Sequence, residues 1–223
     1  MRRRHYIVTT GVLGTCLTLT GCGGGQTGEN ASAPAEDTQA AKDAQPPAGF
    51  KTVGGEANGV TVAVPESWTA LDLTKDDLDQ GLAQSGLSGG ALRQAKRGLE
   101  SLVSSKALWA SDPASAAQSP DKFATNLNGF CQPSAGETTE QLISSAKSQL
   151  GRLDATIDEA AEVPVEAGQA VRVTYTFTSK DVKVRGTQYY VPAGGRTCLV
   201  TLSTDQKDKQ QLFDQIGKTV RPV

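Results

Sequence analysis

The sequence predicts an α+β fold in a single domain, with helices packed on a mostly antiparallel sheet. In the last third of the chain, Val171, Val173, Tyr175 and Phe177 alternate with polar residues, which is typical of a strand with one buried face. Helix-like stretches fall between groups of strands and do not follow every strand. The regular strand–helix alternation that produces a parallel sheet is therefore missing.

The domain is expected to begin with a β-hairpin. The pair Asn58-Gly59 is a strong turn signal between residues 50–53 and the alternating residues 60–64. Pro65 is expected to end the second strand, because proline lacks the backbone N–H that a partner strand needs.

Four helices are predicted from capping residues and from apolar residues at helical spacing. The first begins near Thr74, and the second covers 91–104. Thr138 and Gln141 form a capping-box pattern at the start of the third helix. The fourth covers about 205–220. Its apolar face is expected to contain Leu212, Phe213, Ile216 and Val220.

The remaining strands are expected to complete the sheet, and the last of them form a meander with one apolar and one polar face. Residues 112–121 are rich in Ser, Ala and Pro and are expected to form a loop. The other expected strands are residues 107–111, 123–131, 155–165, 171–177, 182–191 and 196–203.

The N-terminal 21 residues have the properties of a lipoprotein signal peptide. Three arginines precede an apolar run that is too short to span a bilayer but suits a secretory signal. The sequence Leu19-Thr20-Gly21-Cys22 matches the lipobox of bacterial lipoproteins, in which lipid is joined to the cysteine sulfur and the chain is cut just before it. The alternative is an ordinary secretory signal with an unmodified cysteine. We expect signal residues 1–21 and acylation, with chains such as palmitate, at Cys22.

Residues 22–49 are expected to form a disordered tether. Between residues 23 and 48 there is no aromatic residue and no Leu, Ile or Val, so the segment cannot bury enough apolar surface to offset the entropy of ordering. A flexible chain of this length reaches roughly 30 Å. The globular domain is then expected over 50–223, on the extracytoplasmic face of the cell membrane, where the lipid anchor makes the membrane its partner.

The composition after removal of the signal excludes several classes of function. The only histidine, His5, lies in the signal, so Ser-His-Asp and Cys-His catalysis and histidine-ligated metals are excluded. The remaining 19 basic and 24 acidic side chains give a charge of −5, which does not suit nucleic acid. We therefore expect no enzyme, no cofactor, no metal and no nucleic-acid partner. The alternative is an envelope hydrolase that uses carboxylates such as Asp112, Asp158 and Glu159.

Two cysteines remain for a disulfide in the domain. Cys16 leaves with the signal and Cys22 carries lipid, so Cys131 and Cys198 form an even pair in an oxidising compartment. Two buried free thiols are the alternative. A bridge would join the 123–131 strand to the final meander, because the two cysteines share the parity of the apolar residues in their strands.

Several stretches together resemble a known family. They are residues 60–65 with Trp68, Asp112-Pro113, residues 123–127, residues 185–190, and the final strand and helix. In this order they resemble the PsbP-like fold and, within it, actinobacterial lipoproteins of the LpqN/LpqT type. The resemblance covers most of residues 50–223 and implies an antiparallel sheet sandwiched by helices, an envelope location, and binding or scaffolding. Some members of the family look like handlers of envelope glycolipids.

Four aromatic residues are the candidate ligand-binding side chains, namely Trp68, Trp109, Tyr189 and Tyr190. Each tryptophan could stack on a sugar or headgroup or fill the edge of a core, and the core is favoured. The two adjacent tyrosines point to opposite faces of their strand, so one is expected in the core and the other exposed or lining a pocket. Three cationic residues on the polar face could bind an anionic polymer or be merely solvated. They are Arg172, Lys183 and Arg185.

These observations favour a membrane-anchored binding or scaffold domain for an envelope component. A lipid carrier needs a dry pocket of several hundred Å³ between sheet and helices. A protein-docking module needs an exposed apolar or aromatic patch. The sequence leaves open whether the partner is an envelope glycolipid or an envelope protein.

Overall fold

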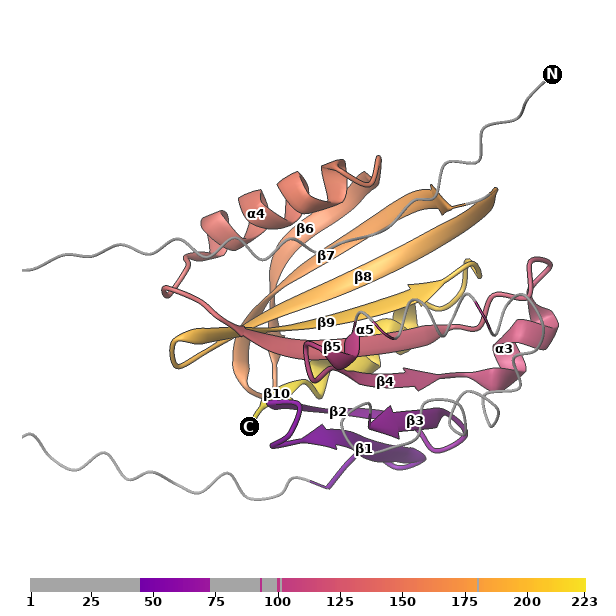
Figure 1. The fold of residues 1–223 in the computed structure, drawn as a ribbon, viewed down its shortest axis with the longest axis horizontal. Coiled ribbons are helices and arrows are strands. Elements are labelled where there is room, and N and C mark those ends of the chain that lie inside the picture. The colour runs from indigo at the N-terminus through magenta and orange to yellow at the C-terminus, as the bar shows by residue number, and fades with distance from the viewer. Residues whose placement is uncertain (1–44, 73–92, 94–99, 101, 180) are drawn as a thin grey trace, which may run out of the picture. The chain divides into compact units, whose positions relative to one another are not determined.

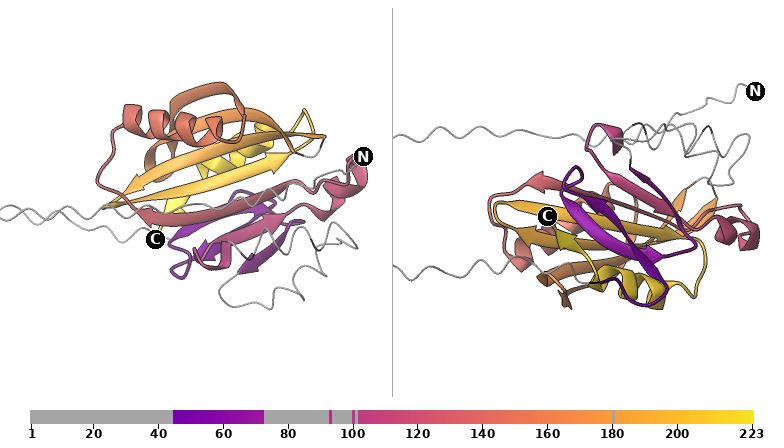
Figure 2. Two further views of the ribbon diagram at one scale, coloured as in Figure 1. Left: turned by 45° about the horizontal axis from the view of Figure 1, so that its top comes forward. Right: turned by 90° about the horizontal axis from the view of Figure 1, so that it is seen from below.

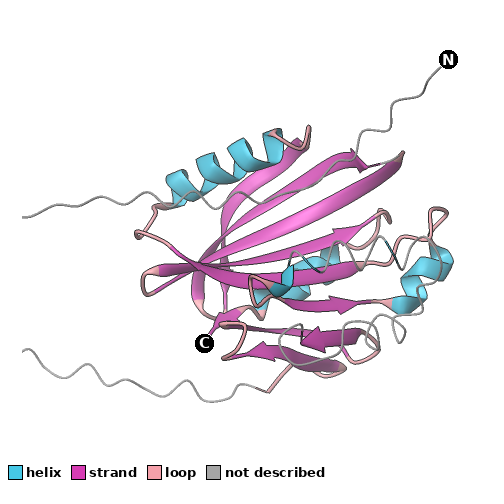
Figure 3. Ribbon diagram, viewed as in Figure 1, coloured by secondary structure: helices cyan, strands magenta, loops and turns pink. Residues whose placement is uncertain are grey.

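A seven-stranded antiparallel sheet occupies the centre of the domain (Figures 1 and 3). The computed structural model describes residues 45–72, 93, 100, 102–179 and 181–223, and residues 46–223 belong to one compact unit. The predicted helix from Thr74 and most of the predicted helix 91–104 lie outside the described residues. Across the sheet, the strand order is β3 (Thr69–Asp72), β4 (Leu108–Ser111), β5 (Asn126–Pro133), β9 (Arg196–Thr204), β8 (Val182–Ala193), β7 (Gly168–Ser179) and β6 (Thr156–Val165).

A smaller antiparallel sheet contains the first hairpin. In it β2 (Val60–Pro65) lies between β1 (Phe50–Gly55) and the short β10 (Arg221–Pro222). The predicted turn before β2 is confirmed, since Gly59 has a φ of +74°, a conformation that glycine adopts without steric cost. The described helices are α3 (Pro113–Gln118), α4 (Thr139–Gly151) and α5 (Gln210–Lys218). The predicted α+β class is therefore confirmed.

The two faces of the large sheet are covered by different elements. Helix α4 contacts β6 and β7 on one face, whereas α5 contacts β2, β6 and β8 on the other. Figure 2 (right) shows the indigo strands β1 and β2 and the yellow helix α5 on the same side of the sheet. The core under α4 contains Leu142, Ala146, Leu150, Val171, Val173, Tyr175 and Tyr190. The core under α5 and the small sheet includes Val62, Val64, Trp68, Leu127, Tyr189, Val191, Val200, Leu202, Phe213 and Ile216.

This double coverage corrects the expectation of one apolar and one polar face for the part of the meander around Tyr189 and Tyr190. Tyr189 and Tyr190 point to opposite faces, and both are buried, with 2% and 4% of their surface exposed. The prediction that one of them would be exposed or line a pocket was therefore wrong. The physical reason is that α4 and α5 each supply a helical apolar face, so both sides of β8 are removed from water at Tyr189 and Tyr190.

Residues 112–121 contain a helix where the sequence suggested only a loop. Asp112 accepts a hydrogen bond from the backbone N–H of Ala114 at 3.1 Å, and Pro113 occupies the first helical position. This is a favourable helix start, because proline has no N–H to leave unpaired there. The hydroxyl of Ser115 donates to the carbonyl of Asp112 and accepts from the N–H of Thr125, both at 2.7 Å. Hydrogen bonds of short polar residues thus stabilise α3, although few apolar side chains are available.

Other elements begin and end close to the predicted residues or are shorter than predicted. The capping box of α4 is confirmed, since Thr138 Oγ1 accepts from the N–H of Gln141 and Gln141 Oε1 accepts from the N–H of Thr138. Strand β5 begins at Asn126, three residues after the predicted start. Helix α5 covers Gln210–Lys218, so the helix expected over 205–220 is shorter at both ends.

Candidate functional site

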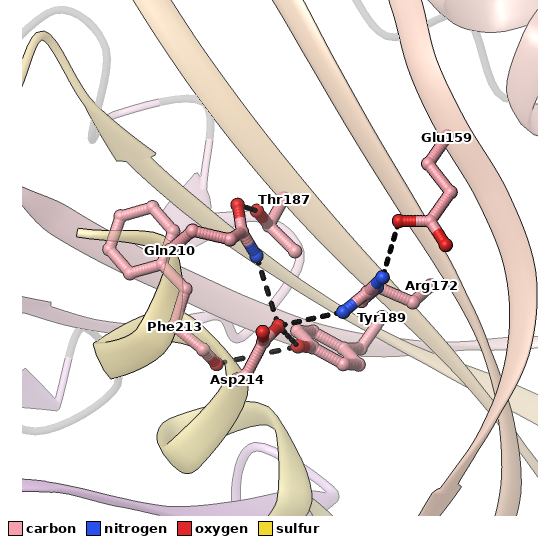
Figure 4. Close-up of polar contacts among 7 residues, drawn as sticks. All are labelled: Glu159, Arg172, Thr187, Tyr189, Gln210, Phe213 and Asp214. Atoms are coloured by element: carbon pink, nitrogen blue, oxygen red, sulfur yellow. Dashed lines mark hydrogen bonds and ion pairs between the residues drawn. The ribbon is translucent and has the colours of Figure 1, made fainter. Parts of the chain in front are cut away.

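A polar cluster lies on the face of the sheet that α5 covers (Figure 4). Alternate residues of a strand point to the same face, so Arg172, Thr174 and Thr176 of β7 share one side. Their register partners on β8 are Tyr189, Thr187 and Arg185, respectively. Of these side chains, Arg172 and Tyr189 contact Asp214 of α5, and Thr187 contacts Gln210 of α5. Arg172 also contacts Glu159 of β6. The cluster therefore joins three neighbouring strands to one helix.

Asp214 is the centre of this cluster. Its Oδ1 atom accepts hydrogen bonds from the Tyr189 hydroxyl, from Arg172 Nη1 and from Gln210 Nε2, each at 3.0 Å. The Tyr189 hydroxyl also lies 3.4 Å from the carbonyl oxygen of Phe213. Since two of the donors belong to the sheet and one to the helix, Asp214 holds α5 in one position on the sheet.

Arg172 forms ion pairs with two carboxylates. Its Nη1 atom pairs with Asp214 at 3.0 Å, and its Nη2 atom pairs with Glu159 Oε2 at 2.5 Å. Burial acts to lower the pKa of Arg172, but Asp214 and Glu159 favour the charged form, and the result is a raised pKa. Arg172 therefore stays charged and does not offer an uncompensated charge to a ligand.

A cavity of about 240 Å³ adjoins this cluster. It is open to solvent, and its wall is formed by β6, β7, β8 and the first residue of α5. Charged, hydroxyl and amide side chains predominate in the lining. The lining residues are Asp158, Glu159, Arg172, Thr174, Tyr175, Thr176, Arg185, Gly186 and Gln210.

Two charges in this cavity are not neutralised by an ion pair. Arg185 donates from Nη1 to the backbone carbonyl of Asp205 at 3.2 Å and forms no ion pair within the part of the chain that the structure describes. Asp158 accepts from the Thr176 hydroxyl at 3.1 Å and likewise has no cationic partner among the described residues. A register irregularity between Ile157 and Glu159 leaves Asp158 without a partner on β7. The cavity thus combines one cation and one anion with spare hydrogen-bonding capacity.

A second cavity, of about 380 Å³, lies beside the disulfide. Cys131 of β5 and Cys198 of β9 are directly opposite in the register and form the predicted bridge. The carbonyl oxygen of Gly59 lies 3.0 Å from Cys131 Sγ, a contact and not a hydrogen bond, because a disulfide sulfur has no proton to donate. Lys106 and Arg196 are among the lining residues.

The four aromatic candidates belong to the core. Trp68 and Trp109 are 2% and 7% exposed, and both tyrosines are buried as described above. A ligand that stacked on any of these rings would have to displace core packing, and a binding role for them stays a prediction. Of the three cations considered with them, Arg172 and Arg185 line the first cavity, whereas Lys183 is exposed and does not line it.

The helix contribution to the site could not be found from the sequence. Gln210 and Asp214 are one turn apart on α5, and this spacing puts them on one helix face, but nothing in the sequence indicates that this face meets β7 and β8. Asp158 and Glu159 were considered only as catalytic carboxylates. Asp112, the third carboxylate considered, instead caps α3.

Three buried tyrosines lead to a prediction about alkaline pH. Burial raises the pKa of Tyr175 to about 12, and burial also raises the pKa values of Tyr189 and Tyr190. In the unfolded chain tyrosines ionise near pH 10, whereas the folded domain holds these protons. Stability is therefore unaffected below pH 10 and falls above it, with Tyr175 alone removing about 2 kcal/mol by pH 12.

Urea unfolding measured from pH 8 to 11.5 would check this prediction. Phenolate absorbance should rise together with the loss of folded structure, because the buried rings ionise only when the domain opens. A free energy of unfolding that stays constant up to pH 11.5 would contradict it.

No protein-family model matches the sequence, and no curated protein matches it significantly. Solved structures with a similar arrangement include cyanobacterial PsbP (CyanoP) from Synechocystis sp. PCC 6803, with 13% identity and a TM-score of 0.47 over 79% of this chain and 94% of that one. LpqN, involved in cell envelope biogenesis of Mycobacterium tuberculosis, has 11% identity and a TM-score of 0.44 over 77% and 88%. A Bacteroides thetaiotaomicron protein has 8% identity and a TM-score of 0.46 over 78% and 49%.

These similarities concern the arrangement of strands and helices. The relation to LpqN/LpqT lipoproteins stays a prediction. Within the described ranges, no helix is long and apolar enough to span a membrane. The same residues contain no group of three or more His, Cys, Asp or Glu side chains placed to hold a metal.

Proposed function

We propose that this chain is a lipid-anchored protein of the cell envelope, whose domain binds the polar part of an envelope component without converting it chemically. The component is a lipid-like molecule or a protein, the two classes that the sequence leaves open, and the group that enters the domain is hydrophilic. The anchor is Cys22, and the binding site is the cavity over β6, β7 and β8.

The observation that carries this proposal is the set of charged, hydroxyl and amide side chains around that cavity. A carrier of acyl chains needs a dry space between sheet and helices, yet side chains of the two cores occupy the space under α4 and under α5. The large apolar residues exposed in the described part of the chain are Val103, Leu153 and Val223, which are far apart in the sequence and only 39–44% exposed. Charged and hydroxyl groups instead surround the cavity of about 240 Å³.

The carboxylates of the cavity support binding more than hydrolysis. Two-carboxylate hydrolysis places its acids on opposite sides of the scissile bond. Here Asp158 and Glu159 are neighbours on the same strand, and Glu159 is paired with Arg172. The non-enzymatic role remains part of the proposal.

The anchor can be tested by metabolic labelling. Cells that express the full chain are given an alkyne-bearing fatty acid, and the purified protein is checked for the label. We expect label on the wild type and on Cys16→Ala, but none on Cys22→Ala, because only the sulfur of Cys22 follows the lipobox. Unlabelled wild-type protein would refute the anchor.

The binding site can be tested with a matched pair of cavity variants. Thr174→Trp would fill the cavity, whereas Thr178→Trp adds the same ring to the same face of β7 outside it. Mass spectrometry of compounds released from the purified full chain should find an envelope component with the wild type and Thr178→Trp but not with Thr174→Trp. An empty wild type, or equal recovery from both variants, would count against the cavity.

A further inference from the structure

We infer that the cavity over β6, β7 and β8 binds a zwitterionic group, with an anion on Arg185 and an ammonium on Asp158. This inference rests on the proposed function and specifies the chemistry of its ligand. It follows from which charged groups of the cavity already have an ion-pair partner within the described part of the protein and which do not. An aminoalkyl phosphate, as in a zwitterionic lipid headgroup, is the class of ligand that fits.

Most polar groups of the cavity already have partners within the protein. Arg172 is shared between Asp214 and Glu159. The amide of Gln210 donates to Asp214 and accepts from the Thr187 hydroxyl. These groups therefore shape the wall, and a ligand would gain little by competing for them.

Arg185 and Asp158 differ from the rest of the lining. A guanidinium has five N–H donors, and the structure gives Arg185 one acceptor, the carbonyl of Asp205. A carboxylate can accept about four hydrogen bonds, and the structure gives Asp158 one donor, the Thr176 hydroxyl. Surplus donors and surplus acceptors therefore face the same small space.

The sheet register keeps these two charges apart. Thr176 lies directly opposite Arg185 on the neighbouring strand, and it bonds to Asp158 on its other side. The Thr176 side chain therefore lies between Asp158 and Arg185. The hydrogen bond from Arg185 to the carbonyl oxygen of Asp205 further disfavours a direct ion pair between the two charges. A ligand with opposite charges separated by a few bonds can contact both groups.

Electrostatics favours a zwitterion over a simple ion. Phosphate would be attracted by Arg185 but repelled by Asp158, and a simple ammonium would meet the reverse combination. The volume of about 240 Å³ suits a compact headgroup rather than a long chain.

Titration of the full chain in uncharged detergent micelles would test the inference. The probes are O-phosphoethanolamine, inorganic phosphate and ethanolamine, with binding measured by calorimetry and by NMR shifts in β6–β8. We expect the zwitterion to bind at least tenfold more tightly than either single-charge probe. Arg185→Gln and Asp158→Asn should each weaken its binding at least tenfold.

Matched controls separate this site from general charge effects. Lys183→Gln removes a cation from the same strand and Asp154→Asn removes an anion just before β6, and neither residue lines the cavity. Both should bind like the wild type, and all variants should show the wild-type melting temperature within a few degrees. Equal binding of phosphate and the zwitterion, or an Asp158→Asn protein that binds normally, would overturn the inference.

A comparison of nanodiscs with and without phosphatidylethanolamine distinguishes two sources of the zwitterion, a lipid headgroup and a free aminoalkyl phosphate. The full chain is placed in each kind of disc. If the lipid headgroup occupies the cavity, added O-phosphoethanolamine should shift the NMR signals only in discs that lack this lipid. Equal shifts in both discs would assign the site to a free aminoalkyl phosphate. No shift in micelles or in either disc would overturn the inference, while the proposed function would still be judged by the Thr174→Trp and Thr178→Trp pair.

Discussion

Replacing Cys131 and Cys198 together by alanine is expected to lower the free energy of unfolding by about 4 kcal/mol. The bridge closes a loop with a sequence separation of 67 residues, which contains α4 and strands β6, β7 and β8. In the chain-entropy model, loss of such a closure gives the unfolded chain much more freedom. Because the two residues pair directly across β5 and β9, the folded strands remain held by their backbone hydrogen bonds. Urea unfolding of the full chain at neutral pH would measure the loss.

Two controls define this prediction. Cys131→Ala alone should cost as much as the double variant, since either change removes the same bridge, and Cys16→Ala should cost nothing. Reduction of the wild type should reproduce the loss. A double variant that unfolds within 1 kcal/mol of the wild type would show that the bridge does not constrain the unfolded chain as proposed.

The sequence predicted the local features of the fold well, where short-range chemistry decides the outcome. Thr138 and Gln141 are three residues apart, and this spacing suffices for the capping box that the structure contains. Helix α3 was missed, although Asp112 and Pro113 are favourable start residues, because part of its stabilisation comes from polar contacts with residues far along the chain. Ser119 Oγ, for example, donates to Asp205 Oδ2 at 2.5 Å. Such long-range polar contacts leave no periodic pattern.

The candidate site was predicted only in part, for two physical reasons. Arg172 and Arg185 were placed on the polar face, because alternation along a strand is readable from sequence. The register irregularity at Asp158 could not be predicted from the sequence. In a regular strand Asp158 and Glu159 would point to opposite faces, whereas one extra residue lets both reach the same cavity. The position of α5, and with it the role of Asp214, depends on packing between segments distant in sequence.

Gly217→Ala is expected to destabilise the domain by about 3 kcal/mol, because α5 lies in close contact with the ring of Tyr189. A Cβ atom at position 217 would be 2.1 Å from Tyr189 Cζ, far inside van der Waals contact. The ring cannot move aside easily, since it is 2% exposed and its hydroxyl is bonded to Asp214. Alanine normally favours a helix over glycine by up to about 1 kcal/mol, so the steric cost must exceed that gain.

A matched variant and a rescue make the Gly217 prediction specific. Gly151→Ala, in the last turn of α4, adds the same methyl group with nothing within 4 Å and should be neutral or stabilising. In a Tyr189→Leu background, the cost of Gly217→Ala should fall below 1 kcal/mol, as the side chain that causes the clash is shorter. Because α5 carries Gln210 and Asp214, displacing it should also weaken zwitterion binding at the cavity. If Gly217→Ala changed the free energy of unfolding in urea no more than Gly151→Ala does, α5 would not pack against Tyr189 as described. The position of α5 in the wall of the proposed site would then be wrong.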